Sequence, residues 1–78
     1  MAKDPADLDE WTKLRAQWQE ANQDARLKRG GVTYAYVEQV EGRSAGPTLR
    51  QVDEAIRMEQ RADSLSMELD NLARRLLS

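Results

Sequence analysis

Residues 55–76 read AIRMEQRADSLSMELDNLARRL, and their apolar residues recur at alternating steps of three and four. The stripe consists of Ala55, Met58, Ala62, Leu65, Leu69, Leu72 and Leu76. This spacing is the heptad repeat of a coiled coil, in which one side of a helix packs against another helix. Thr48 and Gln51 precede the repeat with the spacing of a capping box, which marks the start of a helix. The sequence therefore predicts a long helix over about 48–77.

A second amphipathic segment lies near the N-terminus. Pro5 suits the first position of a helix, because its missing N–H group has no partner there in any case. The apolar residues that follow at helical spacing are Trp11, Leu14, Trp18, Ala21 and Ala25. Basic residues and then Gly30-Gly31 close the segment, and that order is a common signal for the end of a helix. We expect a helix over about 5–29.

The segment between these helices has a different composition. Residues 32–37, VTYAYV, are β-branched and aromatic, which favours a β-strand. Glu41-Gly42 can form a turn, and residues 43–45 can return as a second short strand. We expect a β-hairpin over about 32–45. The predicted fold class is α+β and mostly helical, with the order helix, short β-hairpin, long helix in a single oligomeric domain over residues 1–78.

The long helix is expected to make two kinds of contact. Its first turns, with Leu49, Val52 and Ile56, are predicted to close the subunit's own core against Leu14 and Trp18. Its later turns are predicted to lie against another chain. The candidate interface residues are Trp11, Tyr34, Tyr36, Leu65, Leu69, Leu72 and Leu76. The alternative interpretation is that Trp11 packs in the core against the second helix and that Tyr34 and Tyr36 cover the helix pair.

Composition limits the chemistry that the chain can perform. The 78 residues include no cysteine and no histidine, so disulfides, thiolate metal sites and the commonest general base are excluded. We expect no enzyme activity, no catalytic residue, no metal site and no cofactor. A chain of this length has little core of its own, and oligomerisation is one way to compensate. Its apolar runs are too short to span a bilayer, and its N-terminus lacks the apolar segment of a signal peptide, so we expect synthesis in a cytoplasm and no membrane contact.

Four basic residues are candidates for a contact with DNA phosphates: Arg26, Lys28, Arg29 and Arg43. The competing interpretation of the first three is that they compensate the dipole at the end of a helix. The net charge of −2 weighs against a nucleic-acid binder, because such proteins usually carry a basic surface.

The predicted order of elements resembles the phage lambda W family of head–tail joining proteins. The matching pieces are the first helix ending in Gly30-Gly31, the β segment 32–37, the turn 41–44 and the capped helix from Thr48 to Ile56. The resemblance implies a virion structural protein made in the host cytoplasm. It also implies a ring of copies on the portal, with portal and tail or neck proteins as partners and an optional non-specific contact with packaged DNA.

The chain also departs from that family. Its heptads continue to Leu76, and no basic tail follows them. The alternative hypothesis is a coiled-coil adaptor or small regulatory protein that dimerises through Ala55 to Leu76.

Overall fold

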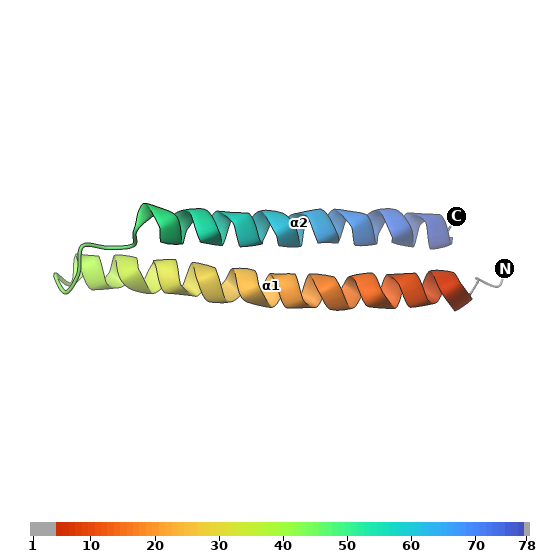
Figure 1. Ribbon diagram of the computed structural model, residues 1–78, viewed down its shortest axis with the longest axis horizontal. Coiled ribbons are helices and arrows are strands. Elements are labelled where there is room, and N and C mark those ends of the chain that lie inside the picture. Colours follow the sequence, from red (N-terminus) through yellow and green to blue (C-terminus); the bar gives the residue numbers. More distant parts are fainter. Residues whose placement is uncertain (1–4, 78) are drawn as a thin grey trace.

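The computed structural model describes residues 5–77, which form two antiparallel α-helices joined by one loop (Figure 1). Helix α1 spans Pro5–Val40 and helix α2 spans Leu49–Leu77. The hairpin is long and thin, with extents of 61 × 16 × 14 Å. Residues 1–4 and 78 of the expected single domain lie outside the described part. The described residues contain no β-strand, so the predicted α+β fold is wrong and the observed fold is a helical hairpin.

Helix α1 does not stop at Gly30-Gly31, as the sequence analysis predicted, but continues for nine more residues to Val40. A glycine ends a helix when it adopts a positive φ, and only Gly42 and Gly46 do so in the described chain. Two glycines within a helix cost about 1 kcal/mol each relative to alanine. The helix accepts this cost because the residues beyond them pack against α2.

Residues 32–37, predicted as a strand, form the penultimate turns of α1. The stripe that begins at Trp11 continues through them, since Val32 lies seven residues after Ala25 and is only 2% exposed. Helix propensities differ by less than about 1 kcal/mol among ordinary residues, whereas burying a valine gains about 1.5–3 kcal/mol. Tertiary packing therefore outweighs the β-type composition of this segment.

Helix α1 ends at the Glu41-Gly42 pair, which was predicted to be a β-turn. Gly42, with φ of 78°, donates from its N–H to the carbonyl of Gln39 at 3.0 Å. The N–H of Arg43 donates to the carbonyl of Glu38 at 2.8 Å. These two bonds define a Schellman motif, which satisfies carbonyl groups that a helix end leaves unpaired.

Helix α2 begins at the predicted capping box. The Thr48 N–H donates to Gln51 Oε1 at 2.7 Å, and the Gln51 N–H donates to Thr48 Oγ1 at 3.1 Å. Both partners of the box are thus reciprocally bonded, which fixes Leu49 as the first helical residue.

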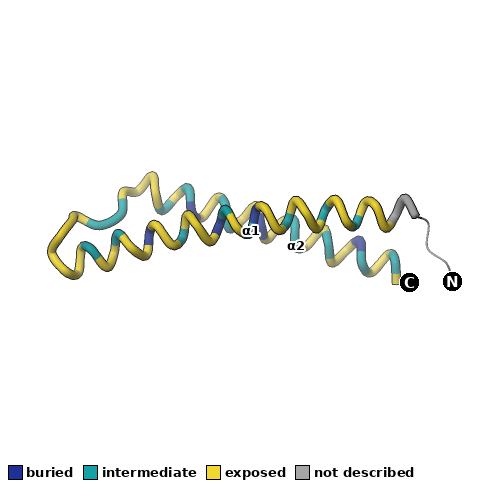
Figure 2. Tube along the Cα trace, turned by 90° about the horizontal axis from the view of Figure 1, so that it is seen from below, coloured by how far each residue is buried: buried dark blue, intermediate teal, exposed yellow. Residues whose placement is uncertain are grey.

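The two helices meet along a seam built mainly from small residues. The buried residues of the described chain are Ala21, Ala25, Val32, Ala55, Ala62 and Leu72. Met58 and Leu65 pack against the three alanines 21, 25 and 62 and are themselves partly exposed. Figure 2 shows that exposed residues dominate both helices and that buried positions are few. The hairpin therefore encloses little of its own apolar surface.

Replacing Gly30 or Gly31 by alanine tests the continuous helix. A Cβ atom at either position meets nothing within 4 Å, and neither residue has a positive φ. Each substitution should raise the free energy of unfolding by about 1 kcal/mol, which thermal unfolding followed by circular dichroism detects as a higher melting temperature.

Gly42→Ala is the matched control, because an L-residue in the left-handed region costs about 1–2 kcal/mol. It should lower the melting temperature. If Gly30→Ala and Gly31→Ala destabilise as Gly42→Ala does, then α1 ends at the glycine pair and the continuous helix is refuted.

Candidate interaction surface

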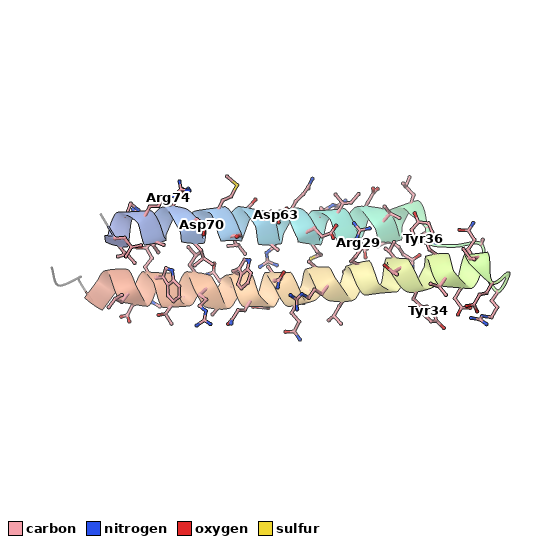
Figure 3. The ribbon with its side chains drawn as sticks, turned by 180° about the vertical axis from the view of Figure 1, so that it is seen from behind. Arg29, Tyr34, Tyr36, Asp63, Asp70 and Arg74 are labelled. Atoms are coloured by element: carbon pink, nitrogen blue, oxygen red, sulfur yellow. The ribbon has the colours of Figure 1, made fainter. Side chains whose placement is uncertain are left out.

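An ion pair across the seam fixes which side chains of α1 and α2 lie opposite each other. Arg29 in α1 donates from Nε to Glu59 Oε2 in α2 at 3.1 Å, and its Nη2 bonds Glu59 Oε1, so the pair is bidentate. Opposite residues in an antiparallel pair have a constant sum of residue numbers. Tyr36, seven residues after Arg29, therefore lies opposite Val52, seven residues before Glu59. Figure 3 shows Arg29 and Tyr36 reaching from α1 toward α2.

The carboxyl groups at the seam and the loop are stabilised as anions. The hydrogen bond from Arg29 lowers the pKa of Glu59, and the hydrogen bond from Lys28 lowers the pKa of Glu54. Arg43 and, to a lesser degree, Tyr34 lower the pKa of Glu38 at the end of α1. Glu59 in turn raises the pKa of Arg29. These pairs hold the two helices in register and tie the loop to α1.

Positions seven residues apart stay on one side of a pair of supercoiled helices. We call the side on which Arg29 and Glu59 meet the Arg29–Glu59 face. In α1 it comprises two rows, 8-15-22-29-36 and 12-19-26-33-40. In α2 it comprises the rows 52-59-66-73 and 49-56-63-70-77. The face runs along the whole length of the hairpin.

Charge is segregated on this face. The α1 rows carry three cations, Arg15, Arg26 and Arg29, and no anion. The α2 rows carry three anions, Glu59, Asp63 and Asp70, and no cation. Only Arg29 and Glu59 pair with each other, while Arg26, Asp63 and Asp70 form no ion pair within the described chain.

Large apolar side chains are concentrated at the loop end of the same face. We call this cluster the loop-end patch, and it consists of Thr33, Tyr36, Val40, Leu49, Val52 and Ile56 of the face and of Val37, which adjoins them on α1. Val40 is 88% exposed and Leu49 is 77% exposed. A shallow, almost wholly apolar hollow of about 280 Å³ lies among the α1 members of the patch. Clustered apolar side chains of this kind mark surfaces that bind another molecule.

A separate groove lies along the middle of the Arg29–Glu59 face. Ala25 and Ala62 form its floor, while Arg26, Arg29 and Asp63 are among the residues of its walls. The alanines leave room for side chains of another helix. The face thus combines an apolar end with a central groove whose two walls carry opposite charges.

The structure contradicts the core role that was predicted for the first turns of α2. Leu49 and Ile56, expected in the subunit's core, are 77% and 40% exposed. Leu14, their expected partner, lies instead near Leu72 at the other end of the hairpin. The reason is the antiparallel arrangement, which brings the start of α2 beside the end of α1.

The leucines assigned to another chain lie along the seam of their own chain. Leu72 is 3% exposed, Leu65 packs on the alanine cluster, and Leu69 and Leu76 are partly buried. Their contact with a second chain stays a prediction, and α1 already covers a large part of their surface.

The predicted aromatic interface residues are not brought together. Trp11 is partly buried on α1, where the guanidinium of Arg15 lies 5.7 Å from its ring centre. Tyr34 and Tyr36 were expected to share one side of a strand, but residues two apart on a helix point in different directions. Figure 3 shows Tyr34 pointing away from α2. Of the two tyrosines, only Tyr36 belongs to the Arg29–Glu59 face.

Three of the four candidate DNA-facing residues are occupied by carboxylates. Lys28 pairs with Glu54 at 3.3 Å, Arg29 pairs with Glu59, and Arg43 pairs with Glu38 at 2.8 Å. Lys28 and Arg29 also lie on opposite sides of the seam. This arrangement disfavours a common phosphate-binding surface.

Other kinds of site find no support among residues 5–77. These residues include no group of three or more acidic side chains placed to hold a metal ion. Neither α1 nor α2 is long and apolar enough to cross a membrane. Comparison of the chain with protein-family models, curated proteins and solved structures gives no match.

Sequence reasoning missed the Arg29–Glu59 face, although part of the signal was present. Residues 49, 56, 63, 70 and 77 form a regular heptad row, and three of them are large and apolar. The row was not recognised because it lies beside the stronger stripe that forms the seam. The α1 half of the face was hidden by the assignment of residues 32–37 to a strand.

The pH dependence of stability tests the Arg29–Glu59 pair. The folded-state pKa of Glu59 is lowered, so the pair stabilises the fold above the unfolded-state pKa of about 4.3, and this stabilisation is lost as the pH falls through the folded-state value. Glu59→Gln should lower the melting temperature slightly at pH 7 and leave it unchanged at the acid end of the titration.

Glu20→Gln is the matched control, since Glu20 is exposed and forms no ion pair with the described residues. A difference between Glu59→Gln and the unchanged protein that persists at low pH would show that the residue acts through packing and not through its charge.

Proposed function

We propose that the protein is a non-enzymatic interaction protein that acts by self-association, as a helical-hairpin adaptor. The observation that carries this proposal is the distribution of apolar side chains. The buried seam is built largely from alanine, while ten large hydrophobic residues of the described part of the chain are exposed. Seven of these ten lie between Leu27 and Ile56, in the loop-end half of the hairpin. A protein whose largest apolar residues face outward is suited to binding other proteins.

The surface area of the chain supports the proposal. A compact monomer of 8.9 kDa would expose about 4,800 Å² by the usual scaling of area with mass. This chain exposes 6090 Å². The excess exceeds the roughly 800 Å² that each partner contributes to an interface of standard size. Self-association would therefore hide surface that a single hairpin leaves in water.

Composition points in the same direction. The absence of histidine and cysteine removes the residues most used as general bases and nucleophiles. The carboxylates of Glu54 and Glu59 form ion pairs that join α2 to α1, so these two carboxylates have structural roles. An adaptor needs only complementary surfaces, and the Arg29–Glu59 face supplies one.

A head–tail connector in a virion is a more specific form of this proposal and stays a prediction. It requires a ring of copies seated on a portal. One feature that suggested it was a β-hairpin between the helices, and residues 5–77 contain none. Self-association is common to both forms, and the number of copies in the assembly separates them.

Light scattering coupled to size-exclusion chromatography tests the proposal. We expect a mass above that of one chain, which falls toward the monomer on dilution, and a melting temperature that rises with protein concentration because association stabilises the folded state. A pair of chains supports the hairpin adaptor, and a ring of many copies supports the connector. A monomer at every concentration, with a melting temperature independent of concentration, would refute self-association.

A further inference from the structure

We propose that a second copy of the chain docks on the Arg29–Glu59 face with its loop beside the first copy's loop, around a two-fold axis parallel to the helices. This proposal rests on the self-association proposed above and adds the surface and the orientation. The resulting dimer is a four-helix arrangement in which α1 of each copy lies against α2 of the other.

The position of the apolar residues selects the face. Tyr36, Val40, Leu49 and Ile56 lie on the Arg29–Glu59 face and are 40–88% exposed. Leu8 and Leu77 extend the same rows at the opposite end and are 51% and 87% exposed. The other side of the hairpin, by contrast, carries Leu27 and Tyr34 among charges of both signs. One face therefore holds most of the apolar surface that a second copy can bury.

Two symmetric orientations bring the Arg29–Glu59 face of one chain against the same face of a second chain. If the two-fold axis runs along the helices, the loops lie together and α1 of one copy faces α2 of the other. If the axis runs across the helices, the loops lie at opposite ends and each helix faces its own copy. Both orientations bury apolar residues at the two ends of the face, so apolar contact alone does not choose between them.

The segregated charges favour the orientation in which the two loops lie together. With the loops together, the α1 rows that carry Arg15, Arg26 and Arg29 face the α2 rows of the other copy, which carry Glu59, Asp63 and Asp70. With the loops apart, three arginines face three arginines and acidic residues face acidic residues. Like charges brought together in an interface are costly, whereas opposite charges fix the register. Arg26 and Asp63 have no ion-pair partner within the described chain and are free to pair between copies.

The constant sum of opposite residue numbers also sets the register of the dimer. A two-fold axis along the helices keeps each residue at its own height, so Arg26 of one copy meets the part of α2 that its own chain places opposite it. That part contains Asp63, since both residues line the same groove. The same rule puts one loop-end patch directly against the other.

Two exposed residues of the loop-end patch provide the test of the surface. Val40→Arg and Leu49→Arg place a charge in the proposed interface without touching the seam, so the single hairpin should keep its helical content. Each should raise the dimer dissociation constant, measured by sedimentation equilibrium on the full chain, about tenfold or more. Leu27→Arg is the control, because Leu27 is 69% exposed on the other side and its substitution should leave the constant unchanged.

Reversed charges test the orientation through rescue. Asp63→Arg places a cation opposite Arg26 of the other copy and should weaken the dimer. Combining it with Arg26→Asp should restore the dissociation constant toward that of the unchanged protein. Because Arg26 and Asp63 also line one groove of the same chain, an equimolar mixture of the two single variants supplies the intermolecular test: it should associate more tightly than either variant alone, and an unchanged affinity of the mixture would contradict the proposed orientation.

A label in the loop reports the orientation directly. The chain has no cysteine, so Ser44→Cys introduces a unique site for a spin label near the tip of the hairpin. We expect a distance between the two labels of a dimer that is far shorter than the 61 Å length of the molecule. A distance close to that length would place the loops at opposite ends and overturn the proposed orientation.

The failures of the two proposals are distinguishable. A chain that stays monomeric at every concentration refutes self-association itself. A chain that associates, but is disrupted by Leu27→Arg and not by Val40→Arg or Leu49→Arg, keeps the proposed function and refutes the Arg29–Glu59 face as its interface.

Discussion

The close packing of alanines between α1 and α2 is the constraint on which the rest of the structure depends. Ala21, Ala25, Ala55 and Ala62 are almost fully buried, and their small side chains leave the seam with no fully buried large residue. Because so little apolar volume lies inside, the seam alone contributes modest stability, and side-chain ion pairs such as Arg29–Glu59 help to fix the register. That register in turn determines which residues face outward together. The exposed apolar surface is thus a direct consequence of the narrow seam.

The two ends of the hairpin differ in the size of the side chains that pack between the helices. At the end with the termini, large residues such as Trp18 and Leu72 occupy the seam. At the loop end, the seam buries only Val32 and Ala55, while Val40, Leu49 and Ile56 point outward. The Schellman motif and the capping box close the loop end by satisfying backbone groups instead of by burying side chains. A partner that covers this end would supply the apolar packing that the single chain lacks.

Much of the secondary structure could be predicted from local signals, and the candidate surface could not. The capping box at Thr48 and Gln51 and the heptad repeat after it identified α2, because both depend only on spacing within one helix. The end of α1 was misplaced since Gly30-Gly31 is a valid stop signal in isolation. The prediction that Tyr34 and Tyr36 share one side was wrong for the same reason. Residues two apart lie on the same side of a strand but on different sides of a helix.

The sequence by itself determined that two heptad stripes of helical spacing exist and where the second helix begins, because these properties depend on residues near one another in the chain. Only the tertiary structure decided that α1 continues through its glycines, since burial of Val32 against α2 outweighs the local cost. It also decided that Leu49 and Ile56 face outward while Leu65 and Leu72 face α1. Which side of a helix is covered depends on the direction and register of its partner, and no single segment of sequence contains that information.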